Sequence, residues 1–205
     1  FRVSANLKDV TYDYAPALVL EKGSRPWPAL VRVAGELVID RAVLKVRLDR
    51  SNLAGGPSLW VNKVEGIVSN LYDDARVAVT ADIHGPLTEA LAVVNGSPLG
   101  GIMSHALAGA TGAGAADYRF KLAFPIAAVD RIAVQGSVVL GGNDIRISPD
   151  TPPLGRARAT VAFTESGFSI NGGQAAALGG EVRIDGGLQA ASIGASSKAA
   201  PRDLR

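Results

Sequence analysis

The side chains that most often carry out catalysis or bind metals are scarce in this sequence. It contains two histidines, His84 and His105, and no cysteine, which excludes disulfides, thiol catalysis and Cys-ligated metals. A histidine-based metal site or a Ser-His-Asp triad would have to use one of these two residues. His84 lies at the end of a predicted strand and His105 on a predicted short helix, so an ordinary surface role is the simpler interpretation of both.

The acidic side chains do not form a recognisable site either. Asp73-Asp74 is most simply a solvated turn, and Asn143-Asp144 is predicted to be a turn that leaves a weak calcium site open. Nothing in the sequence indicates that the carboxylates of Asp82 and Glu89 lie close together in the fold. The chain contains no nucleophile-elbow or phosphate-loop motif. We therefore expect no enzymatic activity, no catalytic residues, no cofactor and no metal site.

The composition indicates a β protein. Of the 205 residues, 47% are hydrophobic but only 5% are aromatic, so the apolar surface is built from Val, Leu, Ile and Ala. The 24 glycines and 11 prolines agree with many short strands and turns. No apolar run of about 18 residues could cross a bilayer as a helix. The net charge of +2, with dispersed Lys and Arg, argues against nucleic acid as a partner. The chain begins at Phe1, inside a predicted strand, which suggests a fragment of a longer polypeptide.

One apolar pattern, with spacings of two, five and two residues, occurs three times. In an antiparallel hairpin this pattern places all four side chains on one face. The three sets are Leu37, Ile39, Leu44 and Val46 about Arg41-Ala42; Val138, Leu140, Ile145 and Ile147 about Gly142-Asn143; and Val161, Phe163, Phe168 and Ile170 about Glu165-Ser166. We predict three hairpins. Arg41-Ala42 and Glu165-Ser166 are poor sequences for a two-residue turn, so we expect four-residue loops around a type I turn at these two places.

Other alternating segments indicate further strands joined by short turns, which is an antiparallel meander. Phe1 to Lys8 alternates regularly, and the change of phase that follows predicts a bulge near Asp9. Leu59 to Ser69 is predicted to be a long strand with Trp60, Val64 and Val68 on one side. Segments 75–83, 117–124 and 181–185 have the same character.

The strand pattern breaks at Gly85-Pro86, where helical spacing begins. Pro86 fits a first helical position, and Ser97-Pro98 resembles the start of a second helix. The two predicted apolar stripes are Leu87, Leu91 and Val94, then Leu99, Ile102, Met103, Ala106 and Leu107. We predict a mainly β fold of about ten strands with two short helices inserted near residues 86–108. The pattern leaves open whether a second sheet covers the apolar face or whether that face remains an open groove.

The order of several motifs resembles the YhdP branch of the AsmA-like proteins, large Gram-negative envelope proteins related in architecture to TamB. The motifs are Trp27-Pro28 leading to Val33-Ala34-Gly35-Glu36-Leu37; Gly85-Pro86-Leu87 with Ala90-Leu91 and Ser97-Pro98-Leu99; Phe124-Pro125-Ile126; Phe163-Thr164 with Gly167-Phe168; and Leu178-Gly179-Gly180. Each is weak by itself, but their order from Phe1 to about Gly187 is fairly specific. We therefore expect a YhdP-type section over residues 1–187 and a flexible tail over residues 188–205.

This resemblance implies a curved β-groove, open along one side, that lets phospholipids cross the periplasm from the inner to the outer membrane. It also implies neighbouring groove sections of the same parent chain and a parent protein anchored in the inner membrane. The acyl chains would lie on an apolar lining, for which the candidates are Leu37, Ile39, Leu44, Val46, Val77, Val79, Phe120, Leu122, Val138, Ile145, Ile147, Phe163, Phe168 and Ile170. The two helices could plug or gate the groove, or only cap an exposed sheet edge.

Other functions remain open at this stage. In a structural or docking module without lipid cargo, the helices would close the apolar face and the polar surface would bind envelope proteins. The lining candidates would then be ordinary core residues. An unrecognised hydrolase or glycan-binding domain would need His84 or His105 beside a carboxylate in a cleft.

Overall fold

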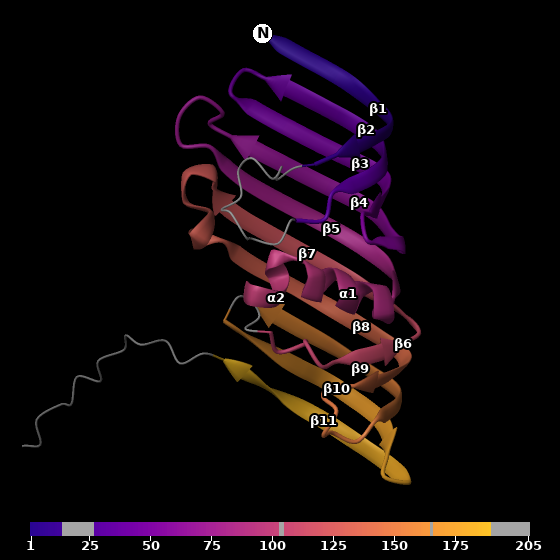
Figure 1. The fold of residues 1–205 in the computed structure, drawn as a ribbon. Helices are drawn as coiled ribbons and strands as arrows, with labels where there is room; N and C mark the ends of the chain where they lie inside the picture. Colours follow the sequence, from indigo (N-terminus) through magenta and orange to yellow (C-terminus); the bar gives the residue numbers. More distant parts are fainter. Residues whose placement is uncertain (14–26, 103–104, 165, 190–205) are drawn as a thin grey trace, which may run out of the picture.

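The computed structural model describes residues 1–13, 27–102, 105–164 and 166–189, and its main feature is one large antiparallel sheet. Ten strands follow each other in the order β1-β2-β3-β4-β5-β7-β8-β9-β10-β11, and the short strand β6 pairs with β8 off this path (Figure 1). Strands β1 and β11 lie at opposite ends, so the sheet does not close. The predicted mainly β, open, curved antiparallel meander with two inserted helices is confirmed.

The strands are long and mostly of similar length, whereas the helices are short. The strands are β1 (Arg2–Tyr12), β2 (Leu30–Asp40), β3 (Val43–Leu53), β4 (Gly56–Ser69), β5 (Arg76–Pro86), β6 (Thr111–Ala113), β7 (Ala115–Pro125), β8 (Ala133–Arg146), β9 (Leu154–Thr164), β10 (Gly167–Ala177) and β11 (Gly180–Gln189). The helices are α1 (Leu87–Gly96), α2 (Pro98–Ile102) and a 3₁₀ helix, Ile126–Arg131.

The first and third predicted hairpins are confirmed in register. Leu37 pairs with Val46 and Ile39 with Leu44, whereas Phe163 pairs with Phe168 and Val161 with Ile170. The predicted four-residue loops are wrong, because Asp40 pairs with Val43 and Thr164 with Gly167, which leaves two residues in each loop. Arg41 adopts a φ of 53°, as residues in tight hairpin turns do. Glu165 lies outside the described residues.

The predicted second hairpin about Gly142-Asn143 is wrong, because β8 continues through these residues as one strand. The buried Asn143 side chain holds the strand in place. Its Oδ1 accepts a hydrogen bond from the Gly141 N–H at 3.0 Å, and its Nδ2 donates to the carbonyls of Ala113 at 3.1 Å and Ala115 at 3.0 Å. These bonds satisfy the backbone beside Gly142, whose φ is 126°. A bulge therefore replaces the predicted turn.

Bulges recur at neighbouring positions of adjacent strands and bend the sheet. The predicted bulge near Asp9 is confirmed by a φ of 53° and a register shift between Leu7 and Val10. At the other end of the sheet, Asp144 accepts a hydrogen bond from the Arg156 N–H at 2.9 Å, and Asp185 accepts one from Gly172 at 2.7 Å. These carboxylates satisfy N–H groups that the regular ladder leaves unpaired. The strands curve toward one face (Figure 1).

A bulge in β4 also corrects the predicted orientation of Trp60. The register with β5 shifts between Val61 and Lys63, so the side-chain alternation changes phase inside the strand. Leu59, Val61 and Val64 are therefore all buried on the apolar face, while Trp60 lies on the opposite face. Trp60 does not share a face with Val64, as the uninterrupted alternation had predicted.

The two helices occur where helical spacing predicts them, with altered boundaries. Pro86 precedes α1 as an extended residue with a ψ of 133°, so the helix begins at Leu87. Ser97 caps α2 as predicted, because its Oγ accepts a hydrogen bond from the Leu99 N–H at 3.3 Å. However, α2 ends at Ile102, so the predicted stripe to Leu107 does not form one helix. Met103 lies outside the described residues, as does the part of the predicted tail from residue 190.

Candidate apolar groove

Apolar side chains form continuous rows across one face of the sheet. Each row follows cross-strand partners, which share a face in an antiparallel sheet. The first row is Val3, Ile39, Leu44, Val68, Val77 and Phe124; the second is Ala5, Leu37, Val46, Gly66, Val79, Leu122 and Val134; the third is Leu7, Gly35, Leu48, Val64, Ala81, Phe120, Gly136, Phe163 and Phe168. No charged residue interrupts these rows.

The opposite face is polar and carries most of the ion pairs. Arg119 Nε lies 2.7 Å from Asp82 Oδ1, and His84 Nδ1 lies 2.7 Å from Asp117 Oδ1. The Asp82 carboxylate raises the pKa of the Arg119 guanidinium through a hydrogen bond and its negative charge. The sheet is therefore strongly two-sided, with charges on one face and aliphatic side chains on the other.

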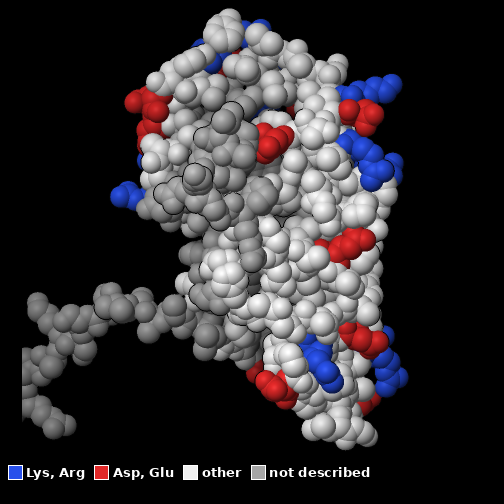
Figure 2. All heavy atoms as spheres, in the orientation of Figure 1, with Lys and Arg blue, Asp and Glu red and all other residues white. Residues whose placement is uncertain are grey.

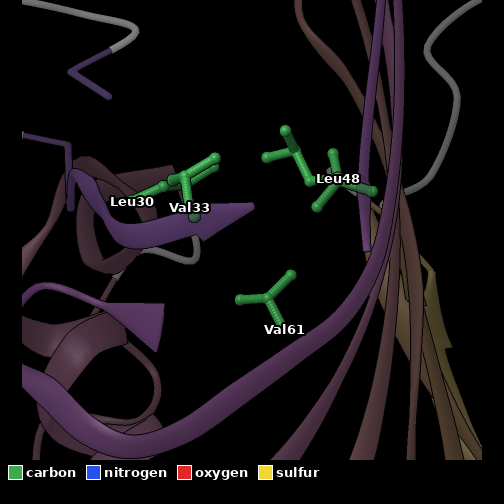
Figure 3. Close-up of a cluster of buried hydrophobic side chains, with 5 residues drawn as sticks. Leu30, Val33, Leu48 and Val61 are labelled. Atoms are coloured by element: carbon green, nitrogen blue, oxygen red, sulfur yellow. The ribbon is translucent and has the colours of Figure 1, made fainter. Parts of the chain in front are cut away.

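The protein's own side chains fill the bent part of the apolar face. Leu30, Val33, Leu48, Val61 and Val64 form a cluster, called here the curl cluster, in which Val33 is 0% and Leu48 2% exposed. In Figure 3, Leu30 and Val33 lie across from Leu48, with Val61 between the two sides. The curvature of the sheet thus closes this part of the face on itself and supplies part of the hydrophobic core.

Helix α1 covers a second part of the apolar face. Leu87 packs with Leu59, Ala116, Tyr118 and Leu140 in what we call the helix cluster. The start of α1 is fixed to the sheet, because the Leu87 N–H donates to the Gly114 carbonyl at 2.9 Å and Glu89 Oε2 accepts from the Ser58 N–H at 2.8 Å. Burial, with a smaller contribution from Asp117, raises the pKa of Tyr118 to about 12.

The first and second rows supply none of the buried residues that define the two clusters, although Val46 and Val79 pack against the curl cluster; we call these two rows the open half. Their described side chains are partly or fully exposed except for Val134, and Val3 at the end of the first row is 50% exposed. In Figure 2, the charged side chains visible on the face that carries the helices lie mainly toward the outline of the molecule. The open half is therefore an apolar surface that the described residues leave partly exposed.

The predicted lining residues divide between these regions. Seven lie in the open half: Leu37, Ile39, Leu44, Val46, Val77, Val79 and Leu122. Within this set, Val46 and Val79 also touch the curl cluster. Phe120, Val138 and Ile145 pack partly buried against the helix cluster. Phe163 and Ile170 are partly exposed, and Phe168 is 44% exposed. Ile147 lies beyond the end of β8 and is 48% exposed, because the predicted return strand does not exist.

Several members of the open half are not among the residues predicted from the sequence, including Val3, Ala5, Val68, Phe124 and Val134. All five lie in segments whose alternation was visible, and each pairs with another residue of the face. These residues could not be assigned to the lining without the strand order. The sequence of one segment does not show which residue of another strand lies opposite a given side chain. Knowledge of the pairing β1-β2 and β5-β7 would have identified Val3, Ala5 and Phe124.

The described residues bring no catalytic constellation together. His84 and Asp117 form their pair on the polar face, where their side chains are 49% and 70% exposed, and His105 is exposed in a turn. Within the described ranges, no group of three or more His, Asp or Glu side chains could hold a metal ion. Asp82 and Glu89 have separate partners, Arg119 and Ser58. Asp144 holds a bulge and does not form the predicted turn.

Two surface hollows lie away from the apolar rows. One is on the polar face, between Arg2, Glu36, Val38, Asp40, Lys45 and Arg47. The other is formed by residues of β8, β9, β10 and the turn into β11, including Leu154 and Ala176. Neither contains a predicted lining residue.

Comparison with known proteins identifies the family. A family model described as YhdP protein matches residues 1–204, nearly the whole chain. Neither the search of curated proteins nor the search of solved structures gave a match. Among the described residues, no helix has the length and apolar character needed to cross a membrane. The match over almost the full length, together with the open antiparallel sheet, shows that the chain belongs to the YhdP family, a family of envelope proteins in the AsmA-like group.

Proposed function

We propose that this chain is a section of a bridge-like lipid-transfer protein of the periplasm. It would shield the acyl chains of phospholipids as they move between the inner and outer membranes. The observation that carries this proposal is the open half, an apolar surface that crosses β1 to β8 without a charge and stays partly exposed at every position except Val134. A large exposed apolar surface indicates an apolar occupant.

The surface chemistry suits transport without tight binding. Each methylene kept from water is worth about 0.8 kcal/mol, so two long acyl chains in water would cost tens of kcal/mol without a shield. The open half consists of aliphatic side chains, one phenylalanine and a glycine, with no polar group to hold a chain at one point. Because every position offers similar contacts, an acyl chain could slide from strand to strand while its headgroup stays in water. No catalytic residue is needed.

The two clusters define the path that we propose. The curl cluster and the helix cluster occupy the bent part of the face, so the acyl chains would run along the first and second rows. Near α1, the remaining path crosses β5 and β7 at Val77 and Val79, with Phe124 and Leu122 opposite them. In this arrangement α1 narrows the groove but does not plug it.

The ends of the sheet suggest how sections join. In the described chain, β1 pairs only with β2 and β11 only with β10. Each therefore presents one edge of backbone N–H and C=O groups that another strand could pair with. We propose that neighbouring groove sections of the same parent chain, anchored in the inner membrane, continue the apolar rows across these edges.

Native mass spectrometry of the gently purified chain, followed by organic extraction and lipid identification, tests the proposal. Co-purifying phospholipid in about stoichiometric amount is the expected result. An apo mass, together with a cooperative melt that added phospholipid does not shift, would contradict it. That outcome would favour the alternative function, a structural or docking module of the envelope without lipid cargo.

A further inference from the structure

Two arginines and a tryptophan form a stack on the polar face of the sheet. The Cζ atom of Arg50, on β3, lies 4.4 Å from the ring centroid of Trp60 on β4, and that of Arg32, on β2, lies 5.7 Å from it. Both distances are within the range of a cation–π interaction. Arg32 must reach across β3 to make this contact, because β2 and β4 are not neighbours.

The backbone is shaped to bring the three side chains to one place. Arg32 occupies a bulge between Val31 and Ala34 with a φ of 53°, a conformation that non-glycine residues adopt uncommonly. The β4 bulge turns Trp60 onto this face. Bulges redirect side chains in this way, and backbone outliers in a folded protein are reasonable indicators of function.

The charge of the stack is not neutralised within the described chain. Arg32 and Arg50 are exposed, and neither forms an ion pair with a described residue, whereas Arg76 and Arg119 on the same sheet are paired with Asp74 and Asp82. A guanidinium that stacks on a ring keeps its N–H edge free for hydrogen bonds to a carboxylate or phosphate. The stack therefore holds two cations in place without using their hydrogen-bonding capacity.

We infer that the Arg32–Trp60–Arg50 stack is a docking site for an acidic segment of a partner protein. The surroundings favour a short carboxylate-bearing segment over a membrane surface. Trp60 pairs across strands with His84, which is bonded to Asp117, and acidic side chains such as Glu36 and Glu65 lie elsewhere on this face. An anionic bilayer would meet these carboxylates as well as the arginines, whereas a narrow acidic segment would meet the arginines alone. This site lies on the face opposite the lipid groove and does not depend on the proposed lipid transfer.

Fluorescence anisotropy of a labelled hexaglutamate peptide, titrated with the 205-residue chain at low salt, tests this inference. The expected result is saturable binding that the double variant Arg32→Gln, Arg50→Gln weakens at least about tenfold, since both charged hydrogen-bond donors of the stack are lost. The matched control is Lys45→Gln, Lys121→Gln, which removes the same charge from exposed positions of the same face and should change affinity less than about twofold. Equal loss in both variants, or no binding, would overturn the inference.

Two further measurements separate the remaining outcomes. Arg32→Lys, Arg50→Lys keeps the charge but loses the planar fork, so it should bind the peptide more weakly than the unchanged chain and remain folded by circular dichroism. It replaces the glutamine variant if that variant does not fold. Vesicles of phosphatidylglycerol and phosphatidylcholine test the other source of anions. Arginine-dependent binding to these vesicles, without binding to the peptide, would show a lipid-headgroup site and refute a protein partner.

Discussion

The substitution Val79→Asp tests the path of the acyl chains most directly. Val79 lies in the second row on β5, with Gly66 and Leu122 as its cross-strand partners, and is only partly buried at the edge of the curl cluster. A hydrated carboxylate here would keep about three methylenes of a passing chain in contact with water, which at about 0.8 kcal/mol each costs about 2.4 kcal/mol. That cost corresponds to a loss of roughly 60-fold in the occupancy of this position by lipid.

The cost to the fold should be smaller than the total stability. Losing the partial burial of one valine side chain costs about 1–2 kcal/mol, against a typical 5–15 kcal/mol for a domain. The variant should therefore melt cooperatively at a lower temperature while its co-purified phospholipid, measured by native mass spectrometry, falls to a few per cent. Ala78→Asp is the matched control, because Ala78 is the preceding residue and is exposed on the polar face. Full lipid occupancy in folded Val79→Asp, or an equal loss in Ala78→Asp, would refute the path.

Three further predictions concern the core, the bulges and pH. Val61→Asp should abolish cooperative unfolding in circular dichroism, because Val61 is 2% exposed and the free-energy cost of burying an unpaired charge there is larger than the stability of the fold. A native-like melt would contradict the assignment of Val61 to the curl cluster. Asp185→Ala should lower the free energy of unfolding in urea by about 0.5–1.5 kcal/mol, because the exposed N–H of Gly172 exchanges its carboxylate acceptor for water, whereas alanine at the exposed Asp49 should have little effect. The pKa of Tyr118 is raised from 10.0 to about 12, so the stability that the neutral Tyr118 side chain contributes is complete below pH 10 and is lost as the pH rises from 10 to 12. The urea midpoint of Tyr118→Phe should therefore fall less over this pH window than the midpoint of the unchanged chain.

The sequence predicts the faces of the sheet well where alternation is uninterrupted. Leu37, Ile39, Leu44 and Val46 share a face and a register, because a hairpin with a short loop leaves few other pairings that bury all four. The same reasoning predicts the start of α1 near Pro86, where helical spacing replaces alternation. Local patterns therefore specify which residues belong to the apolar face.

Bulges account for most of the errors. A bulge adds one residue to a strand and reverses the phase of everything beyond it, and no single residue type marks its position in the sequence. Arg32 and Arg156 adopt a positive φ without being glycine, so their sequence gives no warning. The β4 bulge between Val61 and Lys63, which contains no residue with positive φ, likewise has no marker in the sequence, and the predicted face of Trp60 is wrong for that reason. Gly142 was assigned to a turn because a glycine next to an asparagine suits both a turn and a bulge.

Exposure could not be predicted, because it depends on contacts between distant segments. Val138 and Val77 look alike in sequence, but only Val138 packs in the helix cluster, against residues that include Leu59 and Leu87. The curl cluster likewise joins Leu30 to Val61 through the curvature of several strands. The division of the apolar face into a filled part and an open half is thus a property of the bent sheet as a whole.

This division explains how the fold can be stable while it leaves apolar surface uncovered. A flat sheet with one bare apolar face would gain little core and would aggregate. Bending at the bulges and covering by α1 place the core at one side, so the first and second rows contribute less to stability and remain free for an occupant. Substitutions that unfold the chain should therefore concentrate in the curl cluster and the helix cluster, and those that remove lipid without unfolding should concentrate in the open half. Because Val61 and Val79 act on different properties, a polar scan of both regions should separate unfolding from lipid loss, and a scan in which the two effects always coincide would mean that the open half is ordinary core.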